Sequence, residues 1–105
     1  MSLPTDPDAL VRAFADPPNV AVFATDSILS GAAIVLLVTH ESEDGAWQFL
    51  NGDDIGNDEI RVVALRTILR VDPTLVEVAD LPMGWVATRA SPRESWSRRK
   101  QGTSV

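Results

Sequence analysis

The strongest constraint on the fold of this chain is a pair of apolar segments separated by a short polar one. Residues Ala33–Thr39 form the most apolar stretch, the five residues Glu41–Gly45 are polar and end in glycine, and Ala46–Leu50 is apolar again. Two strands joined by such a loop form an antiparallel hairpin. Because Ala33–Thr39 shows no polar alternation, we expect it to be buried on both faces and therefore central in a sheet.

Further strands are predicted on both sides of this hairpin. Val20–Thr25 is rich in β-branched and aromatic residues, and we expect turns after it at Asp26–Ser27 and at Ser30–Gly31. Ile60–Ala64 alternates as a strand does and continues into a short helical segment that ends at Leu69.

Two helices and two late strands complete the predicted elements. Pro7–Ala15 carries one apolar stripe, and Pro73–Ala79 follows Asp72, whose side chain is of the type that caps a helix. The segments Trp85–Arg89 and Ser95–Arg99 alternate like strands.

These elements favour an α+β fold, because strands that pair through hairpins and take helices singly form antiparallel or mixed sheets rather than doubly wound ones. We predict an antiparallel or mixed sheet of roughly four to six strands with two or three short helices on one face. The 105 residues have the size of one domain, residues 1–105. In this prediction residues 1–18 are its N-terminal helical segment and residues 98–105 are a flexible tail.

The charge of the chain is unevenly distributed. The net charge is −6, with −10 on residues 1–85 and +4 on residues 86–105, where Arg98, Arg99 and Lys100 are consecutive. Cations of this kind can bind phosphates by releasing counterions. The five cations of this tail are few, however, and the acidic remainder of the chain repels a polyanion. We therefore expect no nucleic-acid partner.

Features that would direct the chain out of the cytoplasm are missing from the sequence. It contains no cysteine, and its first residues lack the basic start and apolar core of a signal peptide. The longest apolar stretch, Ala32–Val38, is far shorter than the roughly 20 residues that cross a bilayer. We expect a cytoplasmic protein of a bacterium or a similar cell, with no membrane partner.

Residues suited to catalysis are few. His40 is the only histidine, and although Glu41 and Glu43 stand near it, its place at the start of a polar loop predicts a solvent-exposed side chain. The sequence has no phosphate-binding glycine motif and no thiolate. We therefore predict no catalytic residue, no cofactor and no metal site.

The acidic loop Asn51–Glu59, which includes Asp53 and Asp54, holds the densest set of oxygen ligands. Calcium prefers such oxygens, and paired carboxylates can divide acid and base roles. The spacing departs from that of an EF-hand because Ile55 stands where a ligand is needed. Asp and Asn in such loops commonly bond their own backbone, which favours a solvated turn.

The aromatic residues are the best candidates for a binding surface. Trp47 and Phe49 alternate on one strand, so both rings point to one face of the sheet, which Trp85 and Trp96 can join. Interface hot spots are rich in such rings, but for Trp47 and Phe49 we favour the alternative that they build the core of a small sheet. Trp96, which precedes the basic run, is the ring we expect to be exposed. With Asp53 and Asp54 of the acidic loop, these four rings are the candidate interface.

Two blocks of sequence carry a resemblance to a known family. Ala24–Ile28 followed by Gly31 leads to Gly45–Asp53, which contains the pattern Trp-x-Phe-x-x-Gly-Asp, and Val63–Pro73 ends in Ile-Leu-x-x-Asp-Pro. With these features the stretch from Ala24 to about Trp96 resembles a small bacterial family of unknown function, some of whose members are described as immunity proteins of polymorphic toxin systems. The resemblance implies binding and neutralisation of a toxin, and it implies no catalytic residues.

Three functional hypotheses remain open at this point. The first is a non-catalytic protein-binding domain, similar to an immunity protein, whose acidic surface attracts a basic toxin. The second is a housekeeping or regulatory cytosolic domain that forms a homodimer through its late strands. The third is a small metal-dependent hydrolase that uses the acidic loop.

Overall fold

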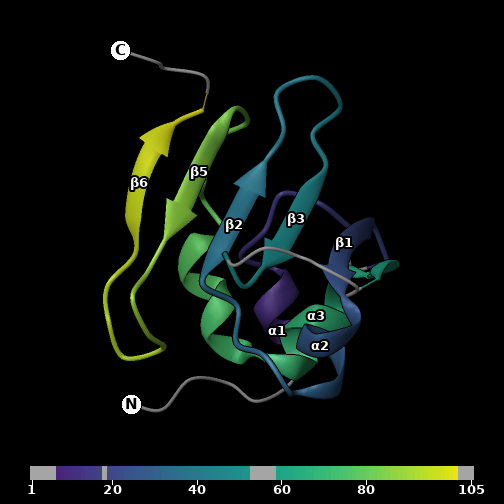
Figure 1. Cartoon of the computed structure of the whole chain (residues 1–105). Helices are drawn as coiled ribbons and strands as arrows, with labels where there is room; N and C mark the ends of the chain where they lie inside the picture. Colours follow the sequence, from purple (N-terminus) through teal and green to yellow (C-terminus); the bar gives the residue numbers. More distant parts are fainter. Residues whose placement is uncertain (1–6, 18, 53–58, 102–105) are drawn as a thin grey trace.

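The computed structural model describes residues 7–17, 19–52 and 59–101 of the chain. Its centre is a mixed sheet of six strands in the order β4-β1-β3-β2-β5-β6, with α1 and α3 packed behind it (Figure 1). This arrangement confirms the predicted α+β fold. The strands are β1 (Ala21–Thr25), β2 (Leu37–His40), β3 (Trp47–Leu50), β4 (Ile60–Ala64), β5 (Trp85–Thr88) and β6 (Ser97–Lys100).

The hairpin that the two apolar segments predict is present. β2 and β3 pair antiparallel, with Val38 opposite Phe49 and His40 opposite Trp47. β2 also pairs with β5, so it lies inside the sheet as expected. The predicted strand is too long, however, because β2 begins only at Leu37 and Ile34 is 48% exposed. In this segment the first residues of the apolar run therefore include an exposed side chain, and only the last residues belong to the buried strand.

The sheet is mixed because β1 runs parallel to β3, with Phe23 beside Gln48. A parallel neighbour needs a crossover connection, and here the chain from β1 to β3 passes through α2 and β2. β4 then returns antiparallel to β1, with Phe23 opposite Val62. β1 thus lies between β3 and β4, where both of its edges are hydrogen-bonded.

Short helices fill the space behind the sheet. They are α1 (Pro7–Val11), α2 (Asp26–Ser30), α3 (Leu65–Val71) and the 3-10 helix η1 (Pro73–Val78). Two expectations need correction. The helix starting at Pro7 ends four residues earlier than predicted, at Val11 rather than Ala15. The predicted turn at Asp26–Ser27 is instead the start of α2, which Ile28 anchors in the core and Gly31 ends at φ 85°.

The core lies between the helices and one face of the sheet. Alternate strand residues face it, so Val22, Val38, Trp47 and Phe49 are buried there. From the helical side, Leu65, Ile68, Leu69, Leu75 and Val78 complete the same cluster. None of the described helices is long and apolar enough to cross a membrane.

The C-terminal strand overturns part of the predicted flexible tail. Residues 98–100 belong to β6, which pairs along its whole length with β5, Trp85 lying opposite Lys100. Residues 102–105 lie outside the described part of the chain. The alternation of residues around Trp96 predicted a late strand, and β6 is that strand. The three consecutive cations Arg98, Arg99 and Lys100 instead favoured a flexible tail.

Replacing Phe49 by alanine is expected to destabilise the fold strongly. The ring is fully buried beside Trp47 at a centroid distance of 6.0 Å, and removing such a ring costs about 3–5 kcal/mol. Urea unfolding followed by circular dichroism measures the loss. Met83→Ala, which truncates a side chain that is 54% exposed, is the control. Equal losses in both variants would contradict this description of the core.

Candidate functional site

The structure places the four rings proposed as an interface in the core or packed against it. Trp47 and Phe49 are buried in the core, and Trp85 is half-buried against it. Asp53 and Asp54 lie outside the described residues. Trp96 is not the exposed ring that the sequence predicts, because it is half-buried and packs against the core. Within the described chain, these side chains therefore do not form one common surface.

Trp47 is held in the core by contacts on all sides. Its Nε1 donates a hydrogen bond of 2.7 Å to Asp16 Oδ2, and its ring meets the ring of Phe14 edge-on at 5.2 Å. His40 stacks on it with centroids 3.8 Å apart, and His40 Nδ1 lies 2.8 Å from the carbonyl oxygen of Leu81. The expectation of a solvent-exposed His40 is wrong, because strand pairing places it on the core face beside Trp47.

Trp96 covers a cation that the sequence analysis did not single out. The guanidinium carbon of Arg89 lies 4.3 Å from the centroid of the Trp96 ring. A guanidinium over an indole face is an attractive arrangement that strengthens when both groups are desolvated. Trp96 Nε1, in contrast, is buried and has no hydrogen-bond partner. The ring is thus held by Arg89 rather than by its own polar group.

Arg89 is the centre of a buried polar network. Its side chain is fully buried at the end of β5. Nε donates to the carbonyl oxygen of Val35 at 3.0 Å, one terminal nitrogen donates to Thr74 Oγ1 at 3.0 Å, and the other donates to Asp72 Oδ2 at 2.9 Å. Two segments distant from it in sequence, at Val35 and at Asp72–Thr74, meet at this one side chain, in addition to the ring of Trp96.

The sequence Asp72-Pro73-Thr74 explains how the acceptors of this network are oriented. Asp72 caps η1, with Oδ1 accepting from the Thr74 backbone at 3.0 Å and from Thr74 Oγ1 at 2.6 Å. Pro73 suits the first helical position because it has no amide hydrogen to satisfy. The cap holds one carboxylate oxygen, so the other points to Arg89.

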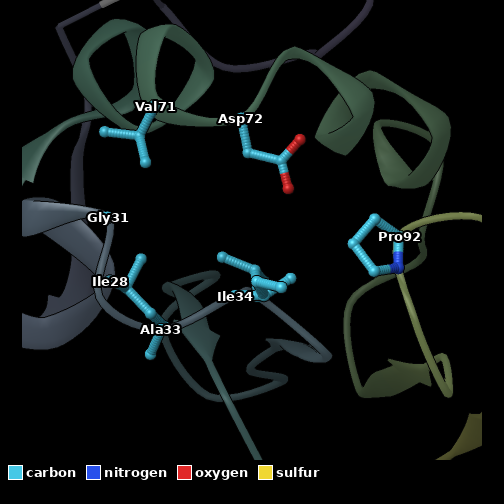
Figure 2. A pocket seen from close by; sticks show the side chains of 8 residues that line it. Ile28, Gly31, Ala33, Ile34, Val71, Asp72 and Pro92 are labelled. Carbon is cyan, nitrogen blue, oxygen red and sulfur yellow. The ribbon is translucent and has the colours of Figure 1, made fainter.

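A hollow of about 250 Å³ opens beside this network. Figure 2 shows Val71 and Asp72 on one side of it and Ile28, Ala33 and Ile34 on the other, with the carboxylate of Asp72 turned into the open space. We call it the Asp72 pocket, and its lining residues are Ile28, Gly31, Ala33, Ile34, Val35, Val71, Asp72 and Pro92.

The rim of the Asp72 pocket is apolar and accessible. Ile34 is 48% exposed and Val71 is 39% exposed, and they are two of the five large hydrophobic side chains that are exposed among the described residues. The carboxylate of Asp72 is 19% exposed, and its charge is balanced by Arg89. The pocket therefore offers apolar walls and one acceptor oxygen whose charge is already compensated, which suits an apolar group with a hydrogen-bond donor.

Within residues 7–17, 19–52 and 59–101, no group of three or more histidine, aspartate or glutamate side chains is placed so that it could hold a metal ion. The acidic loop of the metal-dependent hypothesis lies mainly outside these ranges, at residues 53–58.

Comparisons with protein-family models, with curated proteins and with solved structures found no match for this chain.

The sequence carried two signals for this site. The alternation Trp85, Ala87, Arg89 places the arginine on the core face, where a cation needs an acidic partner. The pair Asp72-Pro73 is typical of a helix start, and it identifies Asp72 as a carboxylate held in place by capping η1. What joins the two is the pairing of β5 with β2, which sets Arg89 beside Val35.

Removing Asp72 is expected to destabilise the protein far more than removing a surface partner. Asp72→Ala leaves the buried Arg89 without its counter-ion, and such a change costs about 3–5 kcal/mol. Asp80→Ala is the matched control, because Asp80 bonds Arg98 at 2.8 Å with a side chain that is 80% exposed. The free energies of urea unfolding should differ clearly, and similar values would contradict the central role of Arg89.

The buried Trp47 and the half-buried Trp96 should lose different amounts of stability on replacement by phenylalanine. Trp47→Phe removes the 2.7 Å bond to Asp16, and a bond to a charged group contributes about 1.5–3 kcal/mol. Trp96→Phe removes an N–H that has no partner and keeps a ring over Arg89, so its stability should stay within about 1 kcal/mol of wild type. Thermal unfolding measures both, and a Trp96→Phe loss as large as that of Trp96→Ala would refute this account.

Proposed function

We propose that this chain is a non-catalytic protein-binding domain of the immunity-protein type, which holds a toxin protein by seating one of its apolar side chains in the Asp72 pocket. The single observation that carries the proposal is the accessible apolar hollow bordered by Ile34 and Val71. Side chains that anchor protein complexes enter pockets of this kind and are surrounded by contacts that exclude water.

The size of the pocket supports a side chain as its occupant. Pockets for drug-sized ligands and cofactors usually measure about 300–1,000 Å³, whereas this hollow measures about 250 Å³. One large aliphatic or aromatic residue fills such a volume, and Asp72 can accept a hydrogen bond from its donor or from the adjoining backbone amide. The walls come from Ile28, Ala33 and Val35, which keep the interior apolar.

The pocket is also held in shape before binding. Val35 and Asp72 both line it and both bond to Arg89, at 3.0 and 2.9 Å. A site ordered in advance loses less conformational entropy when a partner binds, and this increases affinity. The Arg89 network therefore contributes to binding by fixing two of the residues that line the pocket.

The partner class follows from sequence resemblance and from charge. The blocks around Trp47 and Asp72 resemble a family with immunity proteins among its members, and the net charge of −6 is opposite to that of a basic toxin. Opposite charges accelerate encounter and favour the correct partner. In this proposal the complex forms in the bacterial cytoplasm and involves neither nucleic acid nor a membrane.

The experiment is calorimetric titration with the protein encoded beside this gene. Ile34→Glu should weaken binding at least about 30-fold, which corresponds to roughly 2 kcal/mol, because it places a charge on the apolar rim. Met83→Glu changes a residue that is 54% exposed and does not line the pocket, and it should bind as wild type does. Circular dichroism verifies that both variants fold.

Two outcomes would refute the proposal. If Ile34→Glu and Met83→Glu bind alike, the Asp72 pocket is not the contact surface. If the neighbouring protein does not bind the wild-type chain at all, the assignment of a toxin partner fails.

A further inference from the structure

β4 is an edge strand whose outward hydrogen-bonding groups can be identified. Two backbone hydrogen bonds join the ends of β4 to the residues that flank β1. Asp26 N donates to Glu59 O and Leu65 N donates to Val20 O, each at 2.9 Å. In an antiparallel pair alternate residues bond the neighbour. The residues between them, Ile60, Val62 and Ala64, therefore direct their N–H and C=O groups to the free edge, where no described strand pairs with them.

The same residues expose apolar side chains. Ile60 is 53% exposed and Val62 is 61% exposed, and both lie on the sheet face opposite the helices, next to the half-buried Phe23. An edge strand with exposed β-branched side chains and unpaired backbone groups is a template for another strand, and native proteins commonly protect such edges with charged side chains, proline or bulges.

The charges at the two sheet edges decide which edge can pair with itself. At β4, Arg61 bonds Asp26 at 2.7 Å and Glu59 at 2.9 Å, and the hydrogen bond to Asp26 raises the pKa of the Arg61 guanidinium above its ordinary value. The only cation of this edge is therefore neutralised within its own copy.

The other edge is different in this respect. β6 contains Arg98, Arg99 and Lys100 in succession, and Arg98 bonds Asp80 at 2.8 Å. The bond from Arg98 holds the pKa of Asp80 below its ordinary value. Two β6 strands side by side would bring like charges opposite each other, which is destabilising. Self-association through the late strands, one of the three sequence-based hypotheses, is thus disfavoured at β6.

We infer that β4 pairs antiparallel with β4 of a second copy, about a two-fold axis at Val62, so that the two sheets become one. In this register Ile60 lies opposite Ala64 and Arg61 opposite Val63, and no two cations are directly opposite. Every outward N–H and C=O of Ile60, Val62 and Ala64 then finds a partner, and the exposed apolar side chains meet across the axis. The interface uses no residue of the Asp72 pocket, so it is independent of the proposed toxin binding.

Disulfide trapping tests the register directly, because the chain has no cysteine. Val62→Cys should give a cross-linked dimer under mild oxidation, since the two Cα atoms would be about 5.5 Å apart. Met83→Cys provides an exposed thiol elsewhere and should cross-link at least about tenfold more slowly, because only collision joins it. Equal rates for the two variants would overturn the inference. Faster trapping by Ile60→Cys would overturn the register about Val62.

Sedimentation velocity tests the association without a covalent bond. Wild type should dimerise with a dissociation constant below about 1 mM, which corresponds to a free energy of association of roughly −4 kcal/mol or stronger. Val62→Lys should remain monomeric, because it opposes two cations across the axis, and Met83→Lys should behave as wild type. A wild-type chain that is monomeric throughout this range refutes the inference, as does a dimer that Val62→Lys leaves intact. Circular dichroism confirms that each variant is folded.

Discussion

The fully buried guanidinium of Arg89 is the constraint on which this side of the molecule depends. A cation taken out of water is costly unless hydrogen bonds and an opposite charge compensate it. Here Val35, Thr74 and Asp72 provide the acceptors, and Trp96 covers the remaining face. The segment before β2, the junction of α3 with η1 and the loop between β5 and β6 are thereby held at fixed positions around one side chain.

That constraint also explains why a pocket exists beside the network. The backbone at Val35 and the cap at Asp72 are both bound to Arg89, so one side chain sets the separation of two residues that line the pocket. The apolar side chains on these walls consequently remain accessible, and Ile34 and Val71 are more exposed than a core position would allow. The Asp72 pocket and the stabilising network thus both depend on one buried charge. The β4 edge owes its exposure to a different cause, namely its terminal place in the sheet.

Much of the fold could be predicted from the sequence because it rests on local patterns. The hairpin of β2 and β3, the passage from β4 into α3 at Ala64, and the cap of η1 by Asp72 each depend on neighbouring residues alone. The errors have physical reasons. Asp26 begins a helix rather than a turn because Ile28 is anchored in the core, and His40 is half-buried because pairing places it on Trp47.

By itself, then, the sequence determined the types of most elements, the core rings Trp47 and Phe49, and an acidic body with a basic end. These follow from periodicity, turn residues and charge, which act over a few positions along the chain. Only the tertiary structure decided that β1 runs parallel to β3, that Arg89 meets Asp72, and that β4 and β6 are the two edges. Each of these joins residues remote in sequence, and such contacts are selected by packing and by the compensation of a buried charge, which no local pattern expresses.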